Sequence, residues 1–165
     1  IGNPKDETTD IGSLVAKRQV DLLEKQVADA LEKGANVIAR FDIPNELHGA
    51  YYPPTLLGNI TKDMRVWKEE VFGPVLPIVT FTTEEEAIML ANDTIYGLGA
   101  EIICRDADYA NQIALQLEAG TIEINGESRL SCDPFGGYKN SGMGREHGLL
   151  GFRELCQVKV VTSLK

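Results

Sequence analysis

The sequence has few of the residues that build metal centres and disulfide frameworks. Its 165 residues include three cysteines, two histidines and one tryptophan, and no two cysteines form a CxxC pair. Cys104, Cys132 and Cys156 are an odd number at wide spacing, which does not match the ligand spacing of a zinc site. We therefore predict no metal site, and we expect free thiols in a reducing, cytoplasmic compartment.

Basic residues and long apolar runs are also scarce. Lys and Arg total 16 against 25 Asp and Glu, a formal charge of −9, which argues against a nucleic-acid or anionic-membrane partner. No stretch approaches the roughly 18 consecutive apolar residues of a membrane span. The first thirty residues have neither the basic region nor the apolar region of a signal peptide. With 43% hydrophobic and 25% charged residues, the composition is that of an ordinary globular domain.

The start of the chain is unusual for a complete protein. It begins at Ile1, and the turn-forming residues 2–6 (Gly-Asn-Pro-Lys-Asp) follow at once. These residues have no preceding element to turn from. We therefore expect the chain to be an interior piece of a longer protein.

Hydrophobic spacing predicts alternating helices and strands. Within residues 14–33 the apolar side chains recur every three or four positions, as on one face of a helix; they are Val20, Leu23, Val27 and Leu31. Thr83 and Glu86 form a capping box that begins another helix. The remaining predicted helices are one that begins after Asp106 and one over 145–155, and the predicted strands are 35–39, 74–81, 99–104 and 121–125.

The connections between these strands predict the fold class. Because they are ten or more residues long and contain helices, parallel pairing is favoured over hairpins. The prediction is an α/β fold with a doubly wound parallel sheet. The stretch before residue 55, with its two adjacent prolines, is expected to be an extended loop at the surface.

A last strand is predicted to begin at Gln157 and end at Ser163. It has no partner along the sequence, so it must pair with a missing part of the chain or with another subunit. We favour contact in an oligomer. This divides the chain into a main part, residues 1–155, and a C-terminal oligomerisation strand within residues 156–165.

The first candidate site is the segment 69–74 (Glu-Glu-Val-Phe-Gly-Pro), which precedes a predicted strand. A carboxylate at a sheet margin can accept hydrogen bonds from ribose hydroxyls, and an adjacent aromatic ring can stack on a flat ring such as nicotinamide. The competing interpretation is an acidic loop with Phe72 in the core. The residues alone favour the latter, because buried aromatic side chains usually serve packing.

The second candidate is the glycine-rich run 134–146, with four glycines between Gly136 and Gly144. Glycines allow close backbone approach, which suggests a phosphate cradle. However, neither the P-loop order nor a strand followed by GxGxxG is present. The residues alone favour a tight structural loop in which Arg145 or Glu146 anchors the following helix.

The cysteines allow one nucleophile–base pair, Cys132 with His147. We regard this as the weaker alternative, because a lone cysteine is usually a small apolar filler. Cys104 and Cys156 are expected to be buried and inert.

Five motifs together resemble a known family. In chain order they are IGNPKDETTDIGSLV at 1–15, EEVFGP at 69–74, NDTIYGL at 92–98, AGTIEIN at 119–125 and PFGGYKNSGMGRE at 134–146. With this order and spacing the chain resembles the NAD(P)-dependent aldehyde dehydrogenase superfamily over essentially its whole length. The part it resembles is the C-terminal part of the catalytic domain.

The resemblance implies a reaction. In this family a cysteine thiolate attacks an aldehyde, a hydride leaves to the nicotinamide, and a glutamate activates the water that releases the thioester as an acid. Both catalytic residues and the Rossmann cofactor domain lie upstream of the segment that this chain resembles. The resemblance therefore implies no catalytic residue here, a chain inactive by itself, and no role for Cys132 with His147.

The resemblance also implies binding residues. Glu70 matches the residue that binds the nicotinamide ribose hydroxyls of NAD or NADP, and Phe72 matches the aromatic that packs beside the nicotinamide, which reverses the preference stated above. Phe135 matches a wall of the aldehyde pocket. The loop 126–133 matches the segment that sets substrate choice and is about one residue shorter than in many members.

Ser128 and Arg129 in that loop are candidates to bind a substrate carboxylate, which an arginine grips in a bidentate fork. A semialdehyde such as succinate semialdehyde would then be preferred. The competing interpretation, favoured by the usual behaviour of exposed arginines, pairs Arg129 with Glu127 or Asp133.

Two functions of different classes remain open at this point. The first is a segment of an aldehyde dehydrogenase, in which residues 157–163 match the family's oligomerisation strand and predict a homo-oligomer, a dimer or tetramer. The second is a stand-alone, non-catalytic binding or assembly module.

Overall fold

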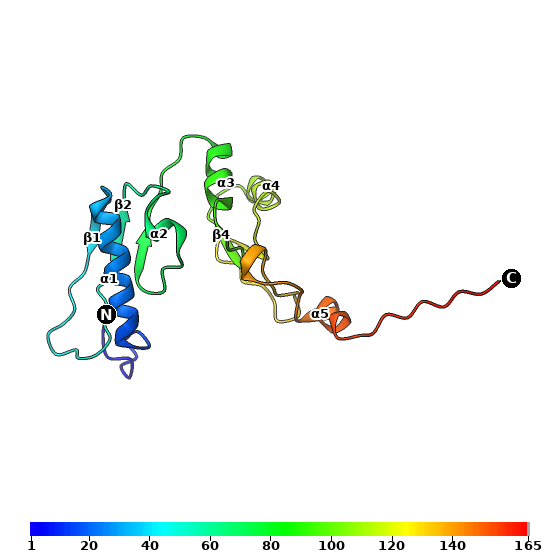
Figure 1. Cartoon of the computed structure of the whole chain (residues 1–165), viewed down its shortest axis with the longest axis horizontal. Helices are drawn as coiled ribbons and strands as arrows, with labels where there is room; N and C mark the ends of the chain where they lie inside the picture. The colour runs from blue at the N-terminus through cyan, green and yellow to red at the C-terminus, as the bar shows by residue number, and fades with distance from the viewer. Residues whose placement is uncertain (165) are drawn as a thin grey trace. The chain divides into compact units, whose positions relative to one another are not determined.

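The computed structural model describes residues 1–164, which fall into two units, residues 1–80 and the residues from 81 onward. Each unit has its own sheet (Figure 1). The first unit contains α1 (Lys17–Glu32), β1 (Asn36–Arg40), β2 (Thr55–Gly58), α2 (Arg65–Lys68) and β3 (Val75–Pro77). The second contains α3 (Glu84–Asn92), β4 (Gly99–Ile102), α4 (Ala107–Ala114), β5 (Thr121–Ile124), the 3-10 turn η1 (Lys139–Ser141) and α5 (Gly148–Glu154).

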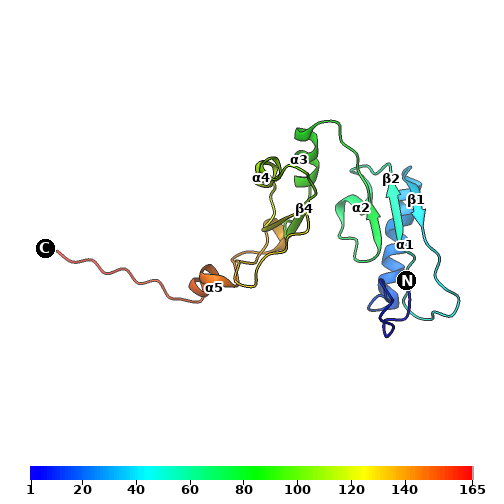
Figure 2. The ribbon, with the colours of Figure 1, turned by 180° about the vertical axis from the view of Figure 1, so that it is seen from behind.

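The core of the first unit lies between α1 and the sheet. In Figures 1 and 2 the helix runs alongside β1 and β2. The buried hydrophobic residues come from α1, the strands, α2 and the loops between them: Val20, Leu23, Val27, Ala30, Ala35, Tyr52, Leu57, Ile60, Met64, Val66 and Val75. The predicted helix is thus confirmed, with its apolar face in the core.

One residue of the predicted apolar face is wrong. Leu31 is 40% exposed, whereas Ala30 is fully buried. The buried stripe runs through Leu23, Gln26 and Ala30, which places Leu31 at its margin on a helix of 3.6 residues per turn.

The first sheet corrects the predicted fold class. Its order is β1-β2-β3, in which β1 pairs antiparallel with β2 and β2 pairs parallel with β3. The α/β class is confirmed, but the single doubly wound parallel sheet is wrong. The unpredicted strand β2 is the reason: β1 reaches it through a loop without a helix, and such a connection permits antiparallel pairing.

The strand β2 was not predicted, because it is only four residues long and directly follows two prolines. Pro53 and Pro54 keep the backbone extended, and Thr55 donates its N–H to the carbonyl of Pro74 at 2.9 Å, which begins the pairing with β3. Tyr52, in the stretch expected at the surface, is 2% exposed. The prolines therefore lead into a core strand.

Asp29 links α1 to α2. Its Oδ2 accepts a hydrogen bond from the backbone N–H of Arg65 at 2.8 Å, at the first residue of α2. Its Oδ1 lies 2.8 Å from Nζ of Lys33. The hydrogen bond from Lys33 and then that from Arg65 hold the pKa of the Asp29 carboxyl below its usual range.

The second unit confirms parallel pairing across a helical crossover. β4 and β5 are parallel, in register from Gly99 opposite Thr121 to Ile102 opposite Ile124, and α4 lies between them in sequence. Asp106 caps α4 as predicted, accepting from the N–H of Tyr109 at 3.0 Å.

The predicted capping box is present in a shifted form. Thr83 caps α3 by accepting from the N–H of Glu86 at 3.2 Å. The Glu86 carboxylate reaches back to the backbone N–H and the hydroxyl of Thr82, at 2.8 and 2.7 Å, instead of to Thr83. The box therefore joins three residues instead of two.

The glycine-rich run packs backbone against backbone. Phe135 and Glu146 exchange two hydrogen bonds of 2.8 Å, which close the segment into a loop. The carbonyl of Gly97, before β4, accepts from the N–H groups of Tyr138 and Gly120 at 2.8 and 3.0 Å. The expected tight structural loop is therefore present, and it is tied to the entrances of both strands.

The C-terminal helix is shorter than predicted. α5 spans Gly148–Glu154, and residues 157–164 continue from it as an extended segment (Figure 2). Within the part of the chain that the structure describes, this segment belongs to no strand, and Val158, Val160 and Val161 are at least four-fifths exposed. The oligomerisation strand stays a prediction, and Lys165, the last residue of the predicted C-terminal part 156–165, lies outside the described residues.

Two of the three cysteines differ from their predicted burial. Cys156 is exposed and Cys104 is half-buried, so the prediction that both are buried is wrong. α5 places Cys156 one turn after Phe152, whose carbonyl lies 3.5 Å from its Sγ, at the surface. No helix within residues 1–164 is long and apolar enough to cross a membrane.

Acid should weaken the link between α1 and α2. Because the pKa of Asp29 is lower in the folded state than the unfolded value of about 3.9, its contribution to stability is present above that value and is lost as pH falls through the folded pKa. We expect Asp29→Asn to lower the free energy of unfolding at pH 6 and to make its fall between about pH 5 and pH 2 shallower. Urea unfolding across this range measures both effects. Asp21→Asn, in an exposed ion pair with Lys17 at 3.8 Å, is the control, and an equal response from both variants would contradict the prediction.

Gly120 should tolerate no side chain. A Cβ at this position would lie 1.7 Å from the carbonyl oxygen of Gly136, whereas at Gly99 the nearest atom, the oxygen of Thr121, would be 3.9 Å away. We expect Gly120→Ala to lower the free energy of unfolding by about 1–3 kcal/mol through overpacking and Gly99→Ala to change it little. Chemical denaturation of the two variants checks this, and a stable Gly120→Ala protein would refute the close backbone packing.

Candidate functional site

The segment 69–74 lies between α2 and β3 and exposes two of its side chains. Glu70 is exposed, and within residues 1–164 its carboxylate has no hydrogen-bond or ion-pair partner. Phe72 is 62% exposed. The interpretation of Phe72 as a core residue is therefore wrong.

Gly73, beside the exposed Phe72, packs closely against α1. A Cβ on Gly73 would lie 2.3 Å from Cδ1 of Leu23. The glycine backbone thus lies directly against α1. The ring of the preceding Phe72 stays at the surface.

Helix α1 also holds the backbone of the segment by hydrogen bonds. Gln19 donates from Nε2 to the carbonyl of Phe72, and Gln26 donates from Nε2 to the carbonyl of Glu70, both at 3.2 Å. The backbone of both candidate residues is fixed while their side chains stay unengaged. Such an arrangement suits a preformed binding edge.

The two adjacent glutamates differ in their surroundings. Glu69 accepts from Nε and Nη2 of Arg65 at 2.7 and 2.8 Å and from Nε2 of Gln26 at 3.1 Å. The hydrogen bonds from Arg65, followed by that from Gln26, lower the pKa of the Glu69 carboxyl. The Glu69 carboxylate is thus used in hydrogen bonds within the fold, whereas the Glu70 carboxylate is available to accept hydrogen bonds from two hydroxyl groups.

The second candidate group lies in the unit that begins at residue 81. The guanidinium of Arg129 lies over the ring of Phe135, 4.5 Å from its centroid. Within residues 1–164 the Arg129 guanidinium makes one hydrogen bond, from Nη1 to the carbonyl of Leu130 at 3.4 Å, so most of its N–H groups have no acceptor there. Ser128, in the same loop, is exposed.

The predicted ion pair of Arg129 is wrong. Among the described residues no ion pair joins Arg129 to Glu127 or Asp133. Asp133 instead accepts from the backbone N–H of Leu130 at 2.8 Å. The guanidinium of Arg129 lies against the flat ring of Phe135, while the carboxylate of Asp133 is hydrogen-bonded to the backbone of the loop.

A cavity of about 400 Å³ lies beside this pair. It is lined by residues of β4 and β5, by the residue immediately before β4 and by the stacked pair of Arg129 and Phe135: Leu98, Gly99, Ala100, Glu101, Thr121, Glu123, Arg129 and Phe135. Glu101 and Glu123 face each other in the parallel register. Sequence reasoning did not select them, because only the pairing of β4 with β5 brings the two carboxylates to one cavity.

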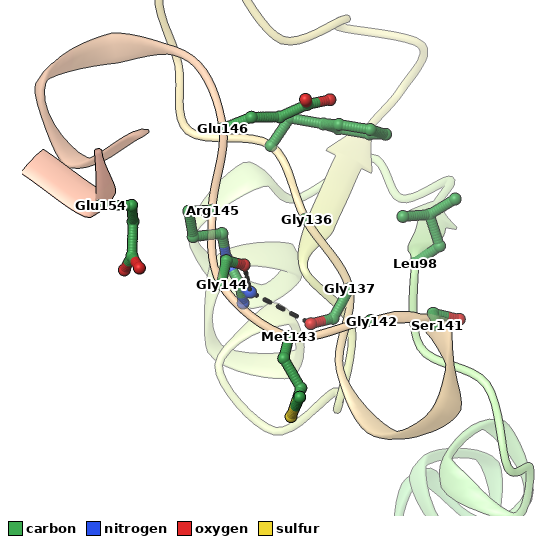
Figure 3. A pocket seen from close by; sticks show the side chains of 11 residues that line it. Leu98, Gly136, Gly137, Ser141, Gly142, Met143, Gly144, Arg145, Glu146 and Glu154 are labelled. Carbon is green, nitrogen blue, oxygen red and sulfur yellow. Dashed lines mark hydrogen bonds between the residues drawn. The ribbon is translucent and has the colours of Figure 1, made fainter. Parts of the chain in front are cut away.

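A second cavity, of about 370 Å³, is formed mainly by the glycine-rich run (Figure 3). Figure 3 shows Arg145 reaching across the loop, where Nη1 donates to the carbonyls of Gly137 and Gly144 at 3.0 and 2.7 Å. Arg145 therefore ties the two arms of the loop together instead of anchoring the following helix. Phe135 and Leu98 border both cavities.

The structure does not support a Cys132–His147 pair. Cys132 is exposed, while Nδ1 of His147 lies 3.2 Å from the carbonyl of Ser131 and its ring meets Phe135 edge to face, with centroids 6.4 Å apart. In residues 1–164 no group of three or more His, Cys, Asp or Glu side chains is arranged to hold a metal ion.

The predicted site residues thus fall into two sets. Arg129 and Phe135 are in direct contact, with Ser128 in the same loop, and Glu70 and Phe72 share one exposed segment of the other unit. Sequence reasoning missed Gln19 and Gln26. For Gln26 the sequence offered one signal, a glutamine within the apolar stripe of an amphipathic helix.

Comparison with known proteins identifies the family. The sequence pattern of the aldehyde dehydrogenase family matches residues 1–161. A putative aldehyde dehydrogenase from Staphylococcus saprophyticus is 39% identical over 163 residues, which are 98% of this chain and 34% of that protein. A putative aldehyde dehydrogenase from Staphylococcus aureus is 38% identical, with the same coverage.

Solved structures of this family share the fold. An aldehyde dehydrogenase of Mycobacterium tuberculosis complexed with NAD+ is 38% identical with a TM-score of 0.87, covering 93% of this chain and 32% of that one. Betaine aldehyde dehydrogenase from Staphylococcus aureus in complex with NAD+ is 37% identical, with a TM-score of 0.85 and coverages of 93% and 31%. Succinate-semialdehyde dehydrogenase from Burkholderia pseudomallei is 37% identical, with a TM-score of 0.83 and coverages of 93% and 32%.

These matches cover nearly all of the chain and are consistent between sequence and structure. The chain spans about a third of the length of the relatives it matches. From residue 1 to residue 161 it belongs to the aldehyde dehydrogenase family.

Proposed function

We propose that the chain is the C-terminal part of the catalytic domain of an aldehyde dehydrogenase that uses NAD or NADP. The overall reaction converts an aldehyde, water and the oxidised nucleotide into a carboxylic acid, the reduced nucleotide and a proton. The observation that carries the proposal is the exposed pair Glu70 and Phe72, whose backbone is fixed by α1 and whose side chains are unengaged.

The residues fit a nicotinamide nucleotide. The free carboxylate of Glu70 is an acceptor suited to the two hydroxyls of a ribose, and the exposed ring of Phe72 offers an apolar surface to a flat heterocycle. Bound there, the nucleotide would accept the hydride that leaves the aldehyde carbon. NAD+ is the bound nucleotide in the similar structures of the Mycobacterium tuberculosis aldehyde dehydrogenase and the Staphylococcus aureus betaine aldehyde dehydrogenase.

The substrate is proposed to be an aldehyde with a carboxylate at its far end. Arg129 presents N–H groups at the cavity wall that Phe135 forms, and Ser128 lies in the same loop. A guanidinium binds a carboxylate through two parallel hydrogen bonds. A succinate-semialdehyde dehydrogenase is among the similar structures.

The chain by itself is proposed to be inactive. The resemblance places the thiolate nucleophile and the general base in an upstream segment, and Cys104, Cys132 and Cys156 do not match the nucleophile. Residues 157–163, which contain the exposed Val158, Val160 and Val161, are proposed to pair with another subunit in a homo-oligomer. The three free thiols fit a cytoplasmic location.

The cofactor role of Glu70 is tested in the complete polypeptide that contains this chain. Replacing the carboxylate by an amide weakens its hydrogen bonds to hydroxyl groups, because charged acceptors bind about twice as strongly. We expect Glu70→Gln to raise the Kd for NADH or NADPH, measured by nucleotide fluorescence, about tenfold. The exposed Glu85→Gln on α3 is the control, and an unchanged Kd in Glu70→Gln would refute this role.

The substrate role of Arg129 is tested with two aldehydes of equal length, succinate semialdehyde and butanal. We expect Arg129→Met to lower kcat/KM for the semialdehyde about tenfold to a hundredfold, because a charge-assisted hydrogen-bonded pair is lost. Butanal has no carboxylate, so its kcat/KM should stay within about twofold. Arg105→Met, in the loop between β4 and α4, is the control. Equal losses for both aldehydes would show that Arg129 supports the pocket and does not select the substrate.

A further inference from the structure

Gln26 is a polar residue in the middle of the apolar stripe of α1. It is 1% exposed, and its neighbours on the stripe, Leu23 and Ala30, are fully buried. Burying an amide is unfavourable unless its hydrogen bonds are made. The hydrogen bonds of Gln26 should therefore explain its presence.

The amide of Gln26 faces the segment that carries Glu70. Its Nε2 donates to Oε2 of Glu69 at 3.1 Å and to the carbonyl of Glu70 at 3.2 Å, whereas its Oε1 is buried and has no partner among the described residues. The chemistry fixes this orientation, because the opposite one would set Oε1 against two acceptors. Both N–H donors are used and the acceptor is left unpaired.

This pattern is poor for stability alone. A methionine has similar length and volume and would fill the same space without an unpaired oxygen. Glu69 would keep its two hydrogen bonds from Arg65. The distinctive contribution of Gln26 is therefore a fixed position for the backbone at Glu70 and for the carboxylate before it.

We infer that Gln26 is a positioning residue for the nicotinamide nucleotide, because its buried amide sets the backbone that presents Glu70 and Phe72. The inference rests on the proposed cofactor role of Glu70. Gln26 itself is enclosed by the core and does not touch the nucleotide. It acts by limiting the conformations of the segment 69–72, so that less ordering remains to be done when the nucleotide binds.

The test is Gln26→Met in the complete polypeptide. We expect the Tm to be unchanged or higher, because the unpaired oxygen is removed, and the Kd for NADH or NADPH to rise about threefold to tenfold. KM for the nucleotide should rise more than kcat falls. Gln112→Met, an exposed glutamine on α4, is the matched control and should change neither Tm nor Kd.

Two further variants make the outcome decisive. Gln26→Leu repeats the measurement with a smaller apolar side chain, should the methionine variant fail to fold. The double variant Gln26→Met with Glu70→Gln should bind the nucleotide no more than about twofold more weakly than Glu70→Gln alone, because both changes act on the same contact.

The possible failures are distinct. An unchanged Kd in Gln26→Met or Gln26→Leu, together with a raised Kd in Glu70→Gln, overturns the positioning role and leaves the proposed function intact. An unchanged Kd in Glu70→Gln overturns the proposed function and the inference with it. A lower Tm with unchanged Kd in the Gln26 variants shows a purely structural residue.

Discussion

The contact between α1 and the segment 69–73 is the constraint on which the first unit and its candidate site depend. Leu23 fills the space that any side chain at Gly73 would need, and Gln26 binds the backbone beside it. Leaving Oε1 of Gln26 unpaired costs about 1–3 kcal/mol. The same helix therefore stabilises the core and fixes the edge that exposes Glu70.

The second unit also holds the backbone of its candidate residue in place, but through the glycine-rich loop instead of a helix. Its candidate residue Phe135 begins a loop of glycines that lies directly on the backbone around Gly97 and Gly120. The loop has little side-chain core of its own, and Arg145 joins its two arms. Phe135 is held between two cavities by these backbone contacts, and Arg129 stacks on its ring. The pocket wall is thus held by main-chain contacts and by Arg145.

Both units combine a fixed backbone with unengaged functional side chains. At Glu70 and Arg129 the charged groups keep hydrogen-bonding capacity, whereas the neighbouring Glu69 and Asp133 use theirs within the fold. Because a ligand must replace the water that solvates a charged group, a preformed and unpaired group binds at the lowest cost of rearrangement. The charged groups of Glu70 and Arg129 are available to a ligand, whereas the neighbouring acids are used within the fold, and this difference supports the proposed binding roles.

Local patterns predicted much of the secondary structure. The helix caps at Thr83 and Asp106 and the parallel pair β4–β5 followed from residues close together in sequence, since capping and crossover length are local properties. The strand β2 was missed because four residues after two prolines carry little periodic signal. The exposure of Phe72 was missed for a different reason, since the packing of the segment 69–73 against α1 involves residues that are distant in sequence.

The sequence by itself determined the family resemblance, the α/β class and the candidates Glu70, Phe72, Phe135 and Arg129, because motifs and periodicity are properties of order along the chain. Only the tertiary structure decided that β1 and β2 are antiparallel and that Gln26 holds the backbone at Glu70. It also decided that Arg129 stacks on the ring of Phe135 instead of forming an ion pair with a nearby acid. Each of these depends on contacts between residues that are distant in sequence or that compete for one partner. Such contacts are chosen by packing and hydrogen-bond satisfaction in three dimensions, which no local pattern records.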